Sequence, residues 1–129
     1  ILKEKNEMSE TKIEELTVNG VTYIAKDAIK AKEVNGMKYC MVRTYSAGVF
    51  AGYVESRVGT EIVLLNARRI WYWDGAASLS QLSVDGTSKP ENCKFPCEVA
   101  KVELLNVIEI IECTEKAKKS IQGVKIWKQ

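Results

Sequence analysis

Short runs of β-prone residues, each ended by a turn signal, dominate the first half of the chain. Two of them flank Asn19-Gly20 in IEELTVNGVTYIAK and predict a β-hairpin, because Asn-Gly is the preferred loop of two-residue hairpin turns. Four more runs follow at intervals of roughly ten residues: MKYCMVRTY, AGVFAGYVES, TEIVLLNA and RRIWYW. We expect these four to form an antiparallel β-meander.

Short helices are expected around and after this meander. Residues 27–33 predict one or two helical turns, and residues 76–85 have the apolar spacing of a short amphipathic helix with Gly86 as its C-cap. Thr114 is expected to cap a short basic helix that ends before Gly123. The final VKIW predicts a last short strand.

Two intervening segments are less regular. Residues 87–98 contain both prolines of the chain and predict a loop. The next stretch, VAKVELLNVIEIIECT, has the β-branched content of a strand but also apolar residues at helical spacing, and we favour a strand. Together, these expected strands and helices predict a single α+β domain over residues 11–129. Residues 1–10 are expected to be disordered or a tag remnant, since the chain begins with Ile1 and Met8 could be a natural start.

Composition excludes several classes of protein. The 129 residues suit one domain, and 19 basic against 17 acidic side chains leave a charge of +2, too little to hold long nucleic acid. No apolar run reaches the roughly 18 residues of a membrane span. The chain has no histidine, which removes the usual proton shuttle and the histidine-dependent nucleophiles and metal sites. We expect no catalytic residue, no metal and no cofactor, and free cysteines.

Arginine and aromatic residues gather in residues 39–73. All four arginines and seven of the ten aromatic residues lie there, whereas lysine is absent from this interval. Guanidinium groups suit bidentate phosphate binding and aromatic rings suit base stacking, so the interval predicts a site for a phosphorylated, base-bearing ligand. The alternative is that the tryptophans fill a core or subunit interface and the arginines form ion pairs with Glu55, Glu61 or Asp74.

Alternation along NARRIWYW sends Arg68 and Arg69 to opposite faces of a strand, the first with Tyr72 and the second with Trp71. One face should meet the core and the other solvent or a partner. In YSAGVFAGYV, Gly52 leaves room for a bulge and tight chain packing, or for a ligand close to the backbone.

Two further segments carry candidate polar contacts. Ser80 lies near a helix start, where a serine is usually a cap but free N–H groups can also bind phosphate. In PENCKF, Asn92, Lys94 and Phe95 place an amide, a cation and an aromatic ring together on a predicted loop. The alternative is a surface loop held in place by Phe95.

The stretches TYSAGVFAGYVESR, LLNARRIWYWDGAASLSQLSVDG and PENCKFP resemble a known family. They are similar to small phage-encoded Thoeris anti-defence proteins of the first-named type, over roughly residues 16–127. The resemblance implies a sponge that binds cyclic ADP-ribose isomers, such as glycocyclic ADP-ribose, without cleaving them. It also implies assembly into dimers and hexamers, cyclic trinucleotides as a second ligand class, and action in the cytoplasm of the infected bacterial host.

Within the matching motifs we select ligand-binding candidates by their chemistry. For phosphate contacts these are Arg57, Arg68 and Arg69, and for stacking they are Trp71, Tyr72 and Phe95. For polar contacts they are Ser80, Asn92 and Lys94.

Three other functions remain open at this stage. One is a structural or host-protein-binding phage module with no small-molecule ligand. Another is a nucleotide hydrolase, for which the chain offers no recognisable nucleophile, base or metal set. The last is single-stranded nucleic-acid binding, which the low net charge disfavours.

Overall fold

The computed structural model describes residues 15–18, 21–24 and 29–129, the first two segments as backbone only. These two segments are the strands β1 (Glu15–Val18) and β2 (Val21–Ile24), which pair antiparallel with Glu15 opposite Ile24. The predicted hairpin is confirmed, although its Asn19-Gly20 loop and the predicted terminal segment 1–10 lie outside the described residues.

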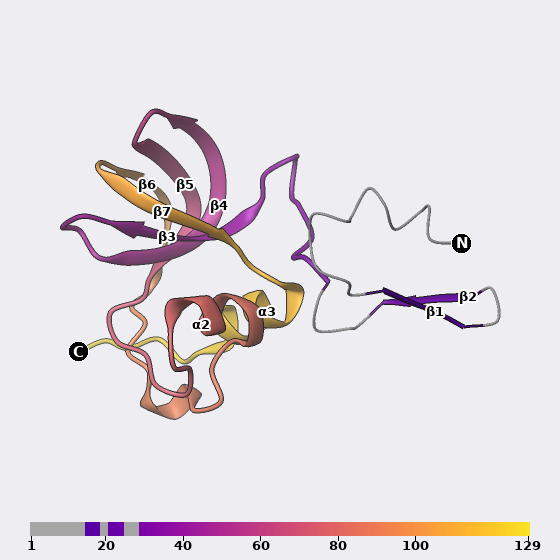
Figure 1. Ribbon diagram of the computed structural model, residues 1–129. Helices are drawn as coiled ribbons and strands as arrows, with labels where there is room; N and C mark the ends of the chain where they lie inside the picture. Colours follow the sequence, from indigo (N-terminus) through magenta and orange to yellow (C-terminus); the bar gives the residue numbers. More distant parts are fainter. Residues whose placement is uncertain (1–14, 19–20, 25–28) are drawn as a thin grey trace.

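A five-stranded antiparallel sheet forms the body of the protein (Figure 1). In spatial order the strands are β6 (Glu98–Leu104), β5 (Glu61–Arg69), β4 (Val49–Val58), β3 (Tyr39–Thr44) and β7 (Val107–Glu112). The predicted α+β class and the meander β3–β4–β5 are confirmed.

Several predicted elements differ from the structure. RRIWYW is not a strand of its own, because Arg68 and Arg69 end β5 and only Tyr72 makes a further bridge, to Lys94. The segment that was ambiguous between strand and helix forms two strands, β6 and β7. Residues 29–33 are not helical, and Lys30 instead bridges to Thr114; residues 27–28 lie outside the described residues. The final VKIW is not a strand but makes one bridge, between Ile126 and Phe95.

The sheet curls strongly, because its two outermost strands are joined by only two residues. Leu105 and Asn106 connect β6 to β7, although these strands lie at opposite edges. Backbone hydrogen bonds hold the closure: Tyr45 donates to the Asn106 carbonyl and Val107 to that of Thr60, each at 2.9 Å. Asn106 adopts the left-handed conformation (φ 57°), which asparagine tolerates better than most residues.

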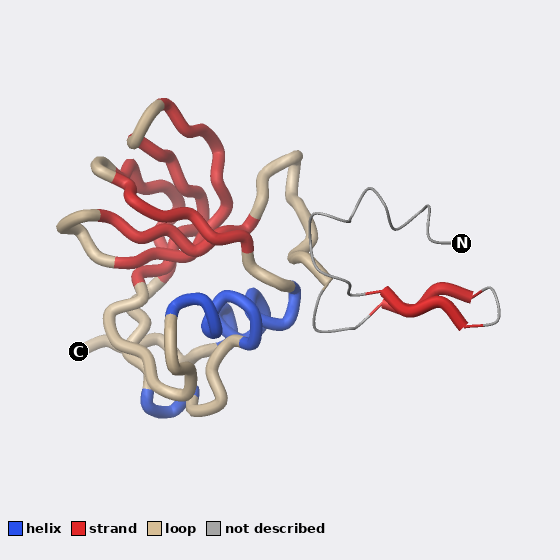
Figure 2. Tube along the Cα trace, in the orientation of Figure 1, coloured by secondary structure: helices blue, strands red, loops and turns tan. Residues whose placement is uncertain are grey.

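Apolar side chains fill both sides of this curled sheet. The concave side buries a cluster of residues from all five strands: Cys40, Val42, Phe50, Ile62, Leu64, Ala67, Leu104 and Val107. The opposite side packs against two helices, α2 (Leu79–Asp85) and α3 (Glu115–Gly123), which lie side by side (Figure 2).

Both helices begin at a hydroxyl cap, which is the predicted Thr114 for α3 and Ser78 for α2. The Ser78 hydroxyl accepts the Gln81 N–H, and the Thr114 hydroxyl accepts the Ala117 N–H. Gly86 closes α2 as predicted. A short 3-10 helix, η2 (Pro90–Asn92), interrupts the predicted loop before β6. In the described part of the chain, no helix is long and apolar enough to cross a membrane.

We expect Gly52→Ala to destabilise the protein by roughly 1–3 kcal/mol, because the site is already full. Gly52 lies at an irregularity in the β4–β5 pairing, and an added Cβ would lie 2.9 Å from the Leu65 carbonyl oxygen and 3.0 Å from the Ala67 Cα. Urea denaturation measures the effect. The control is Gly123→Ala, where an added Cβ meets nothing within 4 Å; equal stability of the two variants would contradict the prediction.

Candidate functional site

Two tryptophans from distant parts of the chain stack on the protein surface. The rings of Trp71 and Trp127 are parallel to within 9°, with their centroids 6.2 Å apart. Both remain accessible, Trp71 at 62% and Trp127 at 38% of full exposure. An exposed pair of large aromatic rings is therefore a candidate site for a ligand or a partner.

The backbone brings these rings together. After β5 the chain forms a reciprocal bridge, in which the Tyr72 N–H donates to the Lys94 carbonyl (3.2 Å) and the Lys94 N–H to that of Tyr72 (2.8 Å). One residue further, the Phe95 carbonyl accepts the N–H of Trp127 at 2.9 Å. The C-terminal residues therefore lie along residues 94–95 and place Trp127 beside Trp71.

Lys94 adds a positive charge to the same surface. Its ammonium lies 5.8 Å from the Tyr72 ring centroid and 5.7 Å from that of Trp127. Among the described residues, no carboxylate forms an ion pair with it. We call Trp71, Tyr72, Trp127 and Lys94 the aromatic patch; it offers faces for a planar ring next to a cation for a phosphate.

Arg68 and Phe95 correct the predicted site, because both are buried. The Arg68 guanidinium, 4% exposed, donates to the carbonyls of Pro96 (2.9 Å), Ile121 (2.8 Å) and Phe95 (3.1 Å). It also lies over the Phe95 ring, which is completely buried in the core. Burial lowers the pKa of Arg68 below its usual value. These two residues join α3 to the start of β6 and present nothing to a ligand.

Arg69, half-buried, lies on the other face of β5, as strand alternation predicts. Its guanidinium lies over the Phe50 ring, 4.3 Å from the centroid, and donates to the Ala47 carbonyl at 2.6 Å. It thereby ties β5 to the β3–β4 loop. Among the described residues, neither Arg68 nor Arg69 pairs with the carboxylates considered as alternatives; Glu55 pairs instead with Lys101 (3.7 Å).

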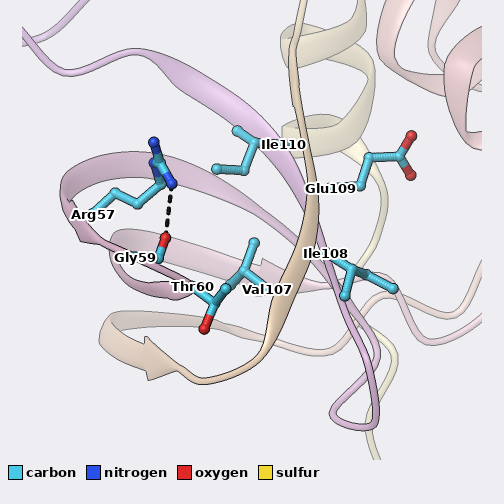
Figure 3. Close-up of a pocket in the computed structure, with 7 residues that line it drawn as sticks. All are labelled: Arg57, Gly59, Thr60, Val107, Ile108, Glu109 and Ile110. Carbon is cyan, nitrogen blue, oxygen red and sulfur yellow. Dashed lines mark hydrogen bonds between the residues drawn. The ribbon is translucent and has the colours of Figure 1, made fainter.

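Arg57 belongs to a separate pocket of about 190 Å³ between the β4–β5 turn and β7 (Figure 3). Its guanidinium donates to the Gly59 carbonyl at 2.7 Å. Val107 and Ile110 lie on the Arg57 side of β7, whereas the Glu109 carboxylate points away and pairs with Arg43 at 2.8 Å. The pocket thus combines apolar walls with a cation.

The other two predicted polar residues do not join the aromatic patch. Ser80 is exposed in the first turn of α2, where Ser78 makes the capping bond. The Asn92 amide donates to the Asp74 carboxylate at 2.9 Å and stabilises the loop after Trp73.

This Asn92–Asp74 contact gives a pH-dependent prediction. Hydrogen bonds from the Asn92 amide and the Gly75 N–H lower the pKa of Asp74. A depressed pKa stabilises the fold above the unfolded-state pKa, and the contribution is lost as pH falls through the folded-state pKa. We expect Asn92→Ala to raise the pKa of Asp74 toward its usual value. A carbon-13 NMR titration of the carboxyl group measures it; an unchanged value would contradict the assignment.

The cysteines do not provide an activated nucleophile in the core. All four are free, and burial raises the pKa of Cys40 to about 11 and that of Cys113 to about 12, so both thiols are protonated at neutral pH. Within residues the structure describes, no cluster of His, Cys, Asp and Glu side chains could hold a metal ion.

Trp127 is the member of the patch that sequence reasoning missed. It lies outside the arginine-rich interval and in a segment expected to be an ordinary strand. The sequence offers one signal for it: in VKIWKQ, the indole of Trp127 lies between two lysines, Lys125 and Lys128.

In its described residues the protein is a small α+β protein, with a curled five-stranded antiparallel sheet packed against α2 and α3 and a separate β1–β2 hairpin. Residues 37–121 match a family model described as a domain of unknown function, DUF6948, and the chain belongs to this family. The matched region contains Trp71, Tyr72 and Lys94, whereas Trp127 lies beyond it. Comparison with curated proteins finds no match, and comparison with solved structures finds none.

Proposed function

We propose that the protein binds and sequesters a cyclic nucleotide signal without cleaving it. The proposed ligand is a cyclic ADP-ribose isomer such as glycocyclic ADP-ribose, and the proposed consequence is inhibition of bacterial Thoeris anti-phage defence. The ligand and this biological role come from the sequence resemblance. The observation that carries the binding proposal is the aromatic patch.

The chemistry of the patch suits such a ligand. A nucleotide offers a planar base and negatively charged phosphate groups. The exposed indole of Trp71 supplies a stacking face, and stacking of a base on an aromatic ring contributes about 1–3 kcal/mol. Lys94 lies against the same rings, so that a phosphate near a stacked base can pair with it.

Sequestration requires only binding, which the residues at the patch can supply. Its four side chains include no carboxylate, thiol or hydroxyl apart from the Tyr72 phenol. The chain also lacks histidine as a general base. We therefore propose a binding protein and not an enzyme, acting in the cytoplasm of the infected host as a homo-oligomer, a dimer or hexamer, with cyclic trinucleotides as a second ligand class.

The second candidate function is a protein-binding phage module with no small-molecule ligand. The same patch supports it, because exposed tryptophan and tyrosine are typical anchors of protein interfaces. Only a binding measurement separates the two functions.

The decisive experiment is calorimetric titration with a cyclic ADP-ribose isomer made by a Thoeris TIR enzyme. The bound ligand is then released by heat and analysed by chromatography. Tight binding with unchanged ligand is the expected result. A new product would establish an enzyme. Absence of binding by a folded protein would overturn the sponge proposal and favour the protein-binding module.

A further inference from the structure

Between its two ends, the strand β7 leaves one side of its backbone without a partner among the described residues; at the ends, Val107 donates to the Thr60 carbonyl and the Cys113 carbonyl accepts the Ala31 N–H. It is the terminal strand of the sheet and pairs only with β3. The Cys113 N–H donates to the Tyr39 carbonyl at 3.0 Å. Because hydrogen-bonded pairs alternate along an antiparallel ladder, Ile111 and Glu109 also direct their backbone groups to β3, and Ile110 and Glu112 direct theirs outward.

This open edge is also apolar and lies beside the Arg57 pocket. The side chains of Ile108 and Ile110 are 52% and 39% exposed. Val107 and Ile110 line the pocket from β7, Thr60 lies beside Val107, and Arg57 reaches the pocket from β4 (Figure 3). The other edge strand, β6, carries charged side chains such as Lys101 and Glu103 along its exposed length.

Charge decides what kind of group belongs in this pocket. The Arg57 guanidinium has one acceptor among the described residues, the Gly59 carbonyl. The nearest acidic lining residue, Glu109, pairs with Arg43 on the other side of β7. A guanidinium without a carboxylate partner, at the end of an apolar wall, is complementary to a carboxylate attached to an apolar group.

We propose that β7 and the Arg57 pocket bind the C-terminal end of an extended peptide with an apolar last residue. The peptide adds a strand to β7 by pairing with Ile110 and Glu112, its last side chain enters the pocket, and its terminal carboxylate binds Arg57. Strand addition of this kind derives affinity from main-chain hydrogen bonds and specificity from the pocket. This site is separate from the aromatic patch and does not depend on the function proposed for it.

The test uses the full chain and a fluorescein-labelled hexapeptide, Thr-Ser-Val-Thr-Ser-Leu, with a free C-terminal carboxylate. Fluorescence anisotropy measures affinity, and nitrogen-15 NMR locates binding by amide shifts. We expect amide shifts at Ile110 and Glu112. The amidated peptide should bind the native chain at least tenfold more weakly than the free acid does. The free acid should bind Arg57→Gln at least tenfold more weakly than it binds the native chain. Ile110→Pro should abolish binding, because it removes an outward N–H while leaving the ladder to β3 intact.

One matched control and three possible results test the proposal. Lys101→Gln on β6 should bind the peptide as the native chain does. Equal binding of the acid and amide peptides, or an absence of shifts on β7 at millimolar peptide, would overturn the carboxylate site. An oligomer in sedimentation that Ile110→Pro dissociates would show that a second copy of the chain covers β7, and would overturn it as well.

Discussion

Replacing Arg68 by methionine is expected to lower the free energy of unfolding by about 3 kcal/mol or more. Three backbone carbonyls, of Phe95, Pro96 and Ile121, lose the Arg68 guanidinium as a donor in this variant. The Phe95 carbonyl keeps the Trp127 N–H and the Ile121 carbonyl keeps that of Val124, so the cost is that of the lost bonds to a charged group. Each such bond contributes about 1.5–3 kcal/mol, and methionine preserves much of the side-chain volume, so the loss reports on hydrogen bonding. Arg68→Lys should lose less, because an ammonium can still donate but lacks the planar fork.

Urea denaturation followed by circular dichroism measures this effect. The matched control is Arg57→Met, which removes an exposed guanidinium with one hydrogen bond and should change stability by less than about 0.5 kcal/mol. An Arg68→Met protein as stable as the native chain would show that water or local rearrangement satisfies the three carbonyls, and would contradict the structural role assigned to Arg68.

The second large effect is expected on ligand binding. Trp71→Ala and Trp127→Ala should each weaken capture of the cyclic ADP-ribose isomer by more than about tenfold, the loss that follows from removing one stacking contact. The two rings are parallel to within 9°, with their centroids 6.2 Å apart, so that they present neighbouring faces to one base.

Calorimetry on the two single variants and the double variant tests this arrangement. If one base contacts both rings, the loss of binding free energy in the double variant differs from the sum of the two single losses. If the two contacts are independent, the losses add. Tyr45→Ala is the control, because Tyr45 is an exposed aromatic residue (79%) outside the patch and should leave affinity unchanged. Native affinity in a folded double variant would remove the aromatic patch from the ligand site.

Local signals in the sequence predicted much of the fold. The caps at Thr114 and Gly86 act as expected, because capping depends on residue chemistry within a few positions. The division of residues 98–112 into two strands at opposite edges was not predictable in the same way. Apolar residues on both faces of a curled sheet produce a mixed periodicity, and only long-range pairing separates the strands.

The site was predictable in part, for a physical reason. Strand alternation correctly placed Arg68 and Arg69 on opposite faces of the strand. Composition cannot show that the Arg68 guanidinium donates its hydrogen bonds to buried carbonyls and not to a ligand. Phe95 looks like a surface aromatic in a polar loop, yet it is completely buried in the core cluster that contains Leu82 and Ile121. Trp127 reaches Trp71 only through the bridge between Phe95 and Ile126, which no spacing in the sequence encodes.

The two-residue link between β6 and β7 has a consequence for how the protein assembles. In chain order, β7 is the last strand of the five-stranded sheet and β3 is the first, yet the two strands pair. This pairing joins segments that β4, β5 and β6 separate in the sequence. Contacts between such distant parts of a chain form slowly, because the entropy of closing the long loop is lost before the contact is gained. Pairing of β7 with β3 is therefore expected to be the slow step of folding, and until it occurs both edges of the apolar strand β7 are open to aggregation.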